Sequence, residues 1–317
     1  ALTQYAPVQS SDSYISQLAT AHNFAQNQLD LSQITQISSL DPLPKASVVL
    51  LKIPNNHSFL RYQLRQIKQQ LTADTQIFAS AKAKDITPNL LAIFQQELGP
   101  TTASLTVKKC RLIRCSYNGA LQQQAKSSFP LRWPLEQSSY SVVNHANVFS
   151  REKLDQGARF FLQHLPTLSA EQTVIDLGCG NGVLGLPLLS KDTAITMLFC
   201  DESYMAVESA RQTISENLPD KLAQCRFIVD DCLSQQADKS VDYVLCNPPF
   251  HQQHAVTGHI ASQMFSDAKR VLKQGGHLRI VANRHLGYAD SLQRLFGNCR
   301  QLAADPKFVI LEAIKRS

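Results

Sequence analysis

The sequence has no apolar run that approaches the roughly 20 residues needed to span a bilayer, and no charged-then-apolar leader precedes its first polar segment. These absences exclude a protein built around membrane-spanning helices. The sequence also lacks a CxxC pair, because its eight cysteines are scattered and several lie inside apolar runs. We therefore expect a soluble, cytoplasmic protein with reduced, mostly buried thiols, without a disulfide framework or a zinc site.

The chain is also poor in charge, with 18% charged residues, 44% hydrophobic residues and a formal net charge of +6. Its 317 residues suffice for two domains with packed cores, which excludes a disordered or fibrous chain. Residues 1–115 carry 11 Lys and Arg against 6 Asp and Glu, whereas residues 146–317 carry 18 of each. This asymmetry suggests an N-terminal domain that faces a polyanion, and a solvated surface with extra lysine is the alternative.

A repeat organises the chain. Ser11-Asp12-Ser13-Tyr14 has the spacing of Asp201-Glu202-Ser203-Tyr204, an offset of 190 residues. We interpret residues 1–115 and 146–317 as two related α/β domains, the first and second copies, joined by a linker at 116–145 that ends in a small β-hairpin. Chance similarity of helix and strand periods is the alternative. The second copy has a longer stretch before Asp201 than the first has before Ser11, so we expect a matching segment to precede Ala1.

The second copy alternates predicted strands and helices, which is typical of a mainly parallel, doubly wound sheet with ligands at the carboxyl ends of its strands. Strands are predicted at 173–177, 195–200, 225–229, 241–246 and 277–282, followed by a hairpin-like pair near 302 and at 308–313. Helices are predicted at 150–164, up to 189, at 203–217, at 260–272 and near 292. Ser150 is the expected cap of the first of these helices.

A glycine-rich loop, Asp176-Leu177-Gly178-Cys179-Gly180-Asn181-Gly182, follows the first predicted strand. Glycines let the backbone approach a ligand, and the start of the next helix offers unpaired amides. The segment from Gly180 to Gly185 also fits GxGxxG, and Asp201 lies about twenty residues later, so a dinucleotide site is an alternative. Asp176 argues against it, because a carboxylate in this loop suits a cationic cofactor better than a pyrophosphate.

Over residues 146–317 the sequence resembles the class I S-adenosylmethionine-dependent methyltransferases. The resemblance implies that Asp176 helps to hold the methionine end of the cofactor, that Asp201 binds both ribose hydroxyls and that Asp231 lies near the adenine amino group. For Asp201, a helix N-cap ahead of Ser203 is the alternative. The cofactor-binding residues expected on this basis are Asp176, Gly178, Gly180, Asn181, Asp201 and Asp231.

The motif Asn247-Pro248-Pro249-Phe250 follows the fourth predicted strand. An exocyclic base amine is a poor nucleophile because its lone pair is delocalised into the ring. The side-chain oxygen of Asn247 and the carbonyl of Pro248 can each accept one amine hydrogen, which turns the lone pair toward the methyl donor. Two prolines stiffen the loop, and Phe250 offers a flat face to an extruded base. A turn after an edge strand is the alternative.

Such loops occur in methyltransferases that act on adenine N6, guanine N2 and glutamine N5. The run that continues to His254, together with segments near Asn147, Asp155 and Arg159, resembles the ribosomal RNA guanine-N2 methyltransferases built from a duplicated domain, and most closely those of the large subunit. The resemblance implies that Phe149 and Asp155 border the cofactor and substrate pocket.

That family implies an α/β fold of two tandem Rossmann-like domains, with a seven-stranded, mostly parallel sheet in the second and a degenerate, truncated first domain. The implied activity is methyl transfer from S-adenosylmethionine to the N2 of a guanine in 23S rRNA. A 16S rRNA guanine-N2 methyltransferase, a protein glutamine-N5 methyltransferase and a non-catalytic RNA-binding protein are the alternatives.

The first copy lacks the residues of the predicted site, since Ser11 stands at the position of Asp201 and Lys52-Ile53-Pro54-Asn55 near that of the proline loop. We expect it to bind no cofactor in the usual way and to hold RNA phosphates with its basic residues. The expected RNA-binding residues are Lys108, Lys109, Arg111 and, in the second copy, His251. The spacing of His251, His254 and His259 shows no supporting partners for a metal ion, so we expect no metal, and we expect a monomer.

Overall fold

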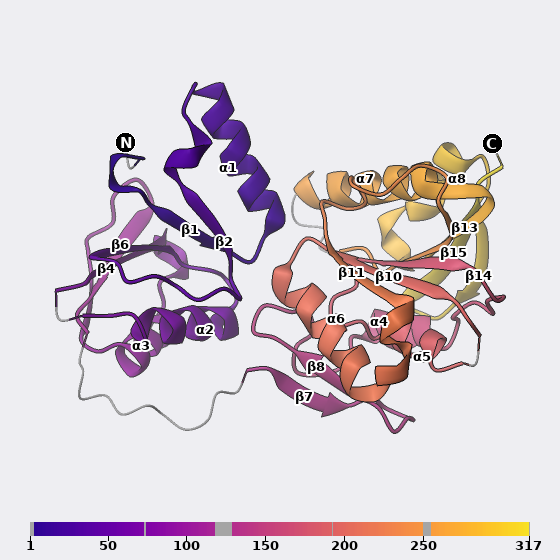
Figure 1. Cartoon of the computed structure of the whole chain (residues 1–317), viewed down its shortest axis with the longest axis horizontal. Coiled ribbons are helices and arrows are strands. Elements are labelled where there is room, and N and C mark those ends of the chain that lie inside the picture. The colour runs from indigo at the N-terminus through magenta and orange to yellow at the C-terminus, as the bar shows by residue number, and fades with distance from the viewer. Residues whose placement is uncertain (1–2, 73, 118–128, 192, 250–254, 317) are drawn as a thin grey trace. The chain divides into compact units, whose positions relative to one another are not determined.

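The computed structural model describes the chain except for residues 1–2, 73, 118–128, 192, 250–254 and 317 (Figure 1). Its contacts divide the chain into two compact units. Unit 1 comprises Ala1–Ser11 and Asp30–Phe129, and unit 2 comprises Asp12–Leu29 and Pro130–Ser317. Helix α1 (Tyr14–Gln26) therefore belongs to unit 2, although its sequence lies in the first copy. The domain boundaries at 115 and 145 stay a prediction.

Unit 2 is built on a seven-stranded sheet in the order β11-β10-β9-β12-β13-β15-β14. The strands from β11 to β13 are parallel to one another, and β15 runs antiparallel to both of its neighbours. The predicted seven-stranded, mostly parallel sheet is confirmed. Its strands are β9 (Thr173–Leu177), β10 (Thr196–Asp201), β11 (Cys225–Val229), β12 (Val241–Cys246), β13 (Leu272–Asn283), β14 (Arg300–Ala304) and β15 (Phe308–Ile314).

Helices cover both faces of this sheet, because its central strands carry apolar side chains on both sides. Phe161 and Ile214 belong to the core on one face, and Phe265 and Leu292 belong to the core on the other. The helices are α4 (Gln156–Leu162), α5 (Gly185–Leu189) and α6 (Tyr204–Asn217) on the first face, and α7 (Ala255–Val271) and α8 (Tyr288–Phe296) on the second (Figure 1).

Helix α4 is shorter than the sequence predicted. Ser150 has a φ of +54°, and the helix begins only at Gln156. Its N-cap is Asp155, whose side chain accepts a hydrogen bond from the Ala158 amide at 2.9 Å. The prediction that Ser150 caps this helix is wrong, because an N-cap residue takes an extended backbone conformation.

The linker ends in the predicted β-hairpin. Strands β7 (Leu131–Pro134) and β8 (Ser141–Asn144) pair antiparallel. The amides of Val143 and His145 donate to the hydroxyls of Thr213 and Ser209 at 3.0 and 2.9 Å. The hairpin is thus fixed to helix α6 by hydrogen bonds between its backbone and buried helix side chains.

Unit 1 repeats the topology of the second half of the unit 2 sheet. Its four-stranded sheet has the order β3-β4-β6-β5, which matches β12-β13-β15-β14 with the same parallel and antiparallel pairs. The predicted duplication is therefore present in the fold. The elements are β3 (Val48–Lys52), α2 (His57–Lys68), β4 (Gln76–Lys82), α3 (Pro88–Glu97), β5 (Thr101–Ala103) and β6 (Cys110–Cys115).

Strands β1 (Val8–Ser11) and β2 (Thr35–Ser38) form a separate two-stranded parallel sheet. With α1 they correspond to β10, α6 and β11 in the second copy. There, β9 lies between β10 and β12, and no described residue of the first copy supplies its counterpart. The described residues of the first copy therefore form two separate sheets.

The eight cysteines are free thiols in this structure. Cys110 is exposed, and the other seven are buried or half-buried. In the part of the chain that the structure describes, no helix combines the length and the apolar composition that crossing a membrane requires.

Candidate active site

The carboxyl ends of β9, β10 and β12 form one edge of the unit 2 sheet. Leu177 of β9 is in register with Cys200 of β10 on one side and with Cys246 of β12 on the other. The residues that follow these three strands therefore emerge at the same level. The chain leaves β9 toward β10 and later returns as β12 on the opposite side of β9, and such a reversal is where open α/β sheets bind ligands.

The glycine loop is hydrogen-bonded to the end of β10. The amides of Gly178 and Cys179 donate to the Cys200 carbonyl at 2.8 and 3.0 Å, and the Gly180 amide donates to Oδ2 of Asp201 at 3.0 Å. The glycine loop and Asp201, about twenty residues apart in the chain, are thus held together by direct hydrogen bonds.

Asp201 does not cap helix α6. The N-cap is Ser203, whose hydroxyl accepts from the Ala206 amide at 3.1 Å. Oδ1 of Asp201 accepts from the Ser203 amide at 3.0 Å, so each carboxylate oxygen is fixed by one backbone amide. The N-cap alternative for Asp201 is wrong, and its role toward the ribose stays a prediction.

Asp176 is a buried carboxylate to which no described residue makes a hydrogen bond. Its side chain sits on β9 at 1% exposure, and neither oxygen has a hydrogen-bond partner among the described residues. Burial, and then the charge of Asp201, raise the pKa of Asp176 well above its ordinary value. A buried carboxylate is costly unless a cation or donor meets it, so these oxygens fit a positively charged cofactor and oppose a pyrophosphate.

The loop beside Asp176 leaves room for such a ligand. Gly180 has a φ of +53°, and a β-carbon placed on it would meet no atom within 4 Å. A side chain at this position would thus meet open space, and the left-handed backbone conformation there favours glycine.

Asn247 follows β12 directly, and only one end of its side-chain amide is hydrogen-bonded to a described residue. Its Nδ2 donates to Oδ2 of Asp155 at 3.5 Å, whereas its buried Oδ1 has no partner within the described residues. Asp155 therefore selects the orientation of the amide, and contact of its acceptor end with a substrate stays a prediction. The hydroxyl of Tyr288 donates to the Pro249 carbonyl at 3.4 Å, which ties the proline loop to the start of α8.

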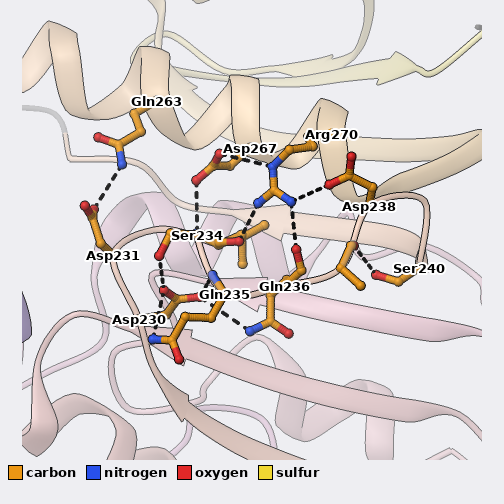
Figure 2. Close-up of polar contacts among 12 residues, drawn as sticks. Asp230, Asp231, Ser234, Gln235, Gln236, Asp238, Ser240, Gln263, Asp267 and Arg270 are labelled. Atoms are coloured by element: carbon orange, nitrogen blue, oxygen red, sulfur yellow. Dashed lines mark hydrogen bonds and ion pairs between the residues drawn. The ribbon is translucent and has the colours of Figure 1, made fainter.

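The loop after β11 contains two adjacent carboxylates with different surroundings, as Figure 2 shows. Asp230 is fully buried and accepts from the Ser234 hydroxyl at 2.6 Å and the Gln235 amide at 3.0 Å. Asp231 accepts from Nε2 of Gln263, on helix α7, at 3.1 Å (Figure 2). Asp230 thus closes its own loop, and the expected contact of Asp231 with adenine stays a prediction.

Two other predicted cofactor residues differ in their surroundings. Asn181 is 7% exposed and donates through Nδ2 to Oδ1 of Asn144 at 2.9 Å, which joins the glycine loop to the end of β8. Phe149 is 60% exposed. Contact of either residue with the cofactor stays a prediction.

Phe250, His251 and His254 lie outside the described residues, so their predicted roles are not placed. His259 is an exposed residue of α7. Among the residues that the structure describes, no group of three or more His, Cys, Asp or Glu side chains is arranged to hold a metal ion.

In unit 1, Lys108 and Lys109 form the tip of a tight hairpin. Val107 and Cys110 exchange two backbone hydrogen bonds of 2.9 Å, and the two lysines between them have φ angles of +46° and +66°. Positive φ at both central residues is typical of type I′ turns, which favour Asn and Gly over lysine. Both lysines are exposed, and Nε of Arg111 donates to the Ser104 carbonyl at 2.8 Å.

Two other basic residues of the first copy are engaged within unit 1. Arg61 and Arg65 both pair with Glu97, at 3.1 Å each, and this glutamate is only 4% exposed. Their charge is largely matched by a buried carboxylate, so they are weaker candidates for RNA contact than the lysines of the turn.

A cavity of about 270 Å³ opens near the ends of β3 and β4, with Pro54, Lys84 and Thr87 in its lining.

Comparison with known proteins agrees with this geometry. Residues 139–312 match the family model described as the methyltransferase small domain, and residues 1–119 match the RLMG N-terminal domain. A T. thermophilus 16S rRNA N2 G1207 methyltransferase, solved with AdoMet and guanosine, superimposes with a TM-score of 0.77 at 18% identity over 98% of this chain and 82% of that one, which shows the shared fold. The protein is an S-adenosylmethionine-dependent methyltransferase.

Curated relatives narrow the class. The chain is 52% identical over 316 residues to ribosomal RNA large subunit methyltransferase G of Aeromonas salmonicida (strain A449), covering 99% of this chain and 83% of that protein. The protein of the same name from Pseudoalteromonas translucida (strain TAC 125) is 49% identical over 308 residues, covering 97% and 80%. The chain belongs to the ribosomal RNA large subunit methyltransferase G family.

Proposed function

We propose that this protein transfers the methyl group of S-adenosylmethionine to the exocyclic N2 of a guanine in 23S rRNA. The observation that carries the proposal is the buried Oδ1 of Asn247, which has no partner among the described residues and lies at the edge where the glycine loop and Asp201 also emerge. The cofactor supplies an electrophilic methyl group on a sulfonium, and the residues of this chain supply orientation.

Asn247 activates the amine by accepting one of its hydrogens. Accepting that hydrogen favours an amine nitrogen whose lone pair is localised and aimed at the methyl group, and no strong base is needed. Asp155 keeps the amide from flipping, because a flip would bring Oδ1 of Asn247 against a carboxylate. Pro248 and Pro249 stiffen the backbone that carries this acceptor.

Asp176 and Asp201 hold the cofactor from the neighbouring strands. The carboxylate of Asp176, without a hydrogen bond among the described residues, suits the positive charge of the cofactor. Asp201, fixed by two backbone amides, accepts from the ribose hydroxyls in this proposal. Gly180 leaves the intervening space open. The relatives named ribosomal RNA large subunit methyltransferase G support the large ribosomal subunit as the source of the RNA.

Unit 1 carries a surface suited to RNA. The hairpin tip at 105–109 exposes Leu105 at 89% and Val107 at 68% beside Lys108 and Lys109. Lys108 and Lys109 both have positive φ, a backbone conformation that costs about 1 to 2 kcal/mol per non-glycine residue. Two lysines at these positions despite that cost indicate that their charge serves a contact. Lys108, Lys109 and Arg111 hold phosphates of the substrate, and we expect the protein to act in the cytoplasm as a monomer.

The substrate assignment is tested by incubating the protein with labelled S-adenosylmethionine and separately with 23S rRNA, 16S rRNA and a glutamine-containing protein fraction. We expect label only in 23S rRNA, recovered as N2-methylguanosine after digestion. Label in 16S rRNA or in protein glutamine alone would overturn the proposal, and absence of cofactor binding by calorimetry would favour a non-catalytic RNA-binding protein. Mass mapping of rRNA from a strain that lacks the gene provides the cellular counterpart.

The role of Asn247 is tested by Asn247→Ala. Turnover should fall by about 10²- to 10³-fold, the usual effect of removing one preorganised polar contact to a reacting group, with cofactor affinity within about twofold. Asn298→Ala is the matched control, because Asn298 exchanges hydrogen bonds with the Ile314 backbone at 2.8 and 2.9 Å, in the C-terminal hairpin. That control should lower stability without this loss of turnover. Equal loss of turnover and cofactor affinity in Asn247→Ala would make the loop structural.

A further inference from the structure

Within unit 2, the two copies meet at equivalent residues. An antiparallel bridge pairs Ser13 with Ser203. The Tyr14 amide donates to the Glu202 carbonyl at 2.9 Å, and the Tyr204 amide donates to the Asp12 carbonyl at 3.0 Å. Tyr204 is the equivalent of Tyr14, and Glu202 is the equivalent of Asp12, at the 190-residue offset of the repeat, so the two hydrogen bonds are equivalent. The contact is therefore self-complementary, as at the interface of a symmetric dimer.

The side chains continue this reciprocity. The Ser203 hydroxyl donates to Oδ2 of Asp12 at 2.6 Å, and the Ser13 hydroxyl donates to Oε2 of Glu202 at 2.6 Å. Each serine is the N-cap of its own helix, Ser13 of α1 and Ser203 of α6. Each helix start is thus bonded to a carboxylate from the other copy.

Asp12 makes further contacts inside the catalytic copy. Its Oδ1 accepts from the Met205 amide at 2.9 Å, and its Oδ2 also accepts from Nδ2 of Asn147 at 2.7 Å. The residue is only 4% exposed. A carboxylate that accepts a first-turn amide stabilises a helix N-terminus, so Asp12 acts on α6 as a cap supplied from outside the helix.

These contacts lead directly to the candidate cofactor site. The backbone amide of Ser203 donates to Oδ1 of Asp201 at 3.0 Å, while its hydroxyl donates to Asp12. Ser203 is therefore held between two carboxylates, one of them expected to bind the cofactor ribose. Asn147 lies two residues before Phe149, between β8 and α4, so the same side chain of Asp12 also fixes that segment.

We propose that Asp12, contributed by the copy without cofactor residues, is a positioning residue for the cofactor site of the other copy. It fixes Ser203 and the start of α6, and thereby the position of the Asp201 carboxylate. This inference rests on the assignment of Asp201 to the ribose in the proposed function. It gives the first copy a second task besides RNA contact, which is to complete the support of the cofactor edge.

The test is the cofactor affinity of the full-length Asp12→Ala variant, measured by calorimetry, with its kinetics. We expect S-adenosylmethionine to bind about tenfold more weakly, the scale of one displaced hydrogen bond to a charged group. The KM for the cofactor should rise by a similar factor, with kcat at saturating cofactor within about twofold of the parent. A merely structural role would not produce this split.

Asp242→Asn is the matched control. Oδ2 of Asp242 accepts from the Thr173 amide at 2.8 Å and pairs with Lys273 at 2.9 Å, at the start of the strands and so at the opposite edge of the sheet. We expect lower thermal stability with unchanged cofactor affinity. If this variant weakens cofactor binding as much as Asp12→Ala does, the effect of Asp12 is general destabilisation and the inference is wrong.

Asp12→Asn is the milder variant if Asp12→Ala does not fold. It keeps an acceptor for the Met205 amide but loses the charge that receives Ser203 and Asn147, so we expect a smaller loss of affinity and faster hydrogen exchange at Met205. Unchanged affinity in a folded Asp12 variant overturns the inference. Asp201→Ala distinguishes failure of the proposed function from failure of this inference. If Asp201→Ala and the Asp12 variants all bind cofactor normally, the assignment of Asp201 to the ribose is wrong. If Asp201→Ala loses cofactor binding and the Asp12 variants do not, only the role of Asp12 is wrong.

Discussion

At the scale of single residues, the site is marked by buried polar atoms that have no hydrogen-bond partner among the described residues. Buried polar groups are generally hydrogen-bonded, so an exception calls for a functional explanation. Here the exceptions include both oxygens of Asp176 and Oδ1 of Asn247, at neighbouring strand ends. One suits a cation and the other an amine hydrogen, which are the two groups that methyl transfer to a base must bring together.

The cost of leaving Asp176 unpaired predicts that Asp176→Asn stabilises the protein without cofactor. The melting temperature should rise by about 2 to 6 °C at neutral pH, because a buried unpaired charge is replaced by a neutral amide. Cofactor affinity should fall at least tenfold, on the order of one charged contact. Asp201→Asn is the control, since its oxygens already accept two amides and the change should not stabilise. Equal destabilisation in both variants would contradict this account.

The raised pKa of Asp176 predicts how pH acts on stability and on binding. A carboxyl group whose pKa is raised by folding favours the folded state at low pH, and this contribution is lost as pH rises from the ordinary pKa through the raised one. Cofactor binding should change in the opposite direction, because the positive ligand needs the ionised form. Calorimetry across a pH series should show affinity rising with pH and proton release on binding, and Asp176→Asn should remove the proton-linked part.

At the scale of elements, the hairpin between β5 and β6 joins a favourable sheet pairing to an unfavourable turn. The strands pair antiparallel, yet both turn residues, Lys108 and Lys109, have positive φ. A turn of this kind is most stable with Asn and Gly. Lysine at both positions therefore trades stability for charge at an exposed tip.

This trade predicts a variant with opposite effects on stability and RNA binding. Changing Lys108→Asn and Lys109→Gly together should raise the free energy of unfolding by roughly 1 to 2 kcal/mol, because it relieves the left-handed strain. RNA affinity should fall. The measurements are thermal unfolding and RNA titration, and Lys82→Asn with Lys84→Gly, at exposed positions outside this turn, provides a control for lost charge. A stability loss in the turn variant would show that the lysines are not strained.

At the scale of the whole molecule, the two copies of the duplicated fold carry different residues at matching positions. The second copy holds the glycine loop, Asp201 and Asn247, whereas the first copy holds Ser11 at the matching position and a basic hairpin. The duplicated sheet topology survives without the chemistry, since the apolar packing that fixes a fold is independent of the polar residues that form a site. The two functions should therefore be separable by substitution.

The separation is tested with Lys108→Gln, Lys109→Gln and Arg111→Gln in one chain. RNA binding should weaken, and the slope of log affinity against log salt should decrease by about 2 to 3, because three phosphate contacts and their released counterions are lost. Cofactor affinity should not change. Filter binding over a salt series and calorimetry give the two readouts, and unchanged RNA affinity would remove unit 1 from the proposed RNA interface.

Local sequence patterns determined much of the second copy. The predicted strands at 225–229 and 241–246 have the bounds of β11 and β12. They could be predicted because each is a short apolar run between turn residues, a pattern that depends only on residues close together in the sequence. The same reasoning placed Ser150 as a helix cap, where the φ of +54° shows a turn. Both Ser and Asp are suitable N-cap residues, so the sequence does not show which of several nearby candidates has the required backbone conformation. In the structure Asp155 is the N-cap.

By itself the sequence determined the repeat, the alternating sheet and the motifs at its strand ends, because these are properties of residues near one another in the chain. Only the tertiary structure decided which carboxylates are paired. Among the described residues it gave Asp176 no hydrogen-bond donor, gave Asp201 two amides, and brought Asp12 to Ser203 across 191 positions. Burial and hydrogen-bond partners depend on long-range packing, and no local pattern records which distant backbone amide a given carboxylate meets.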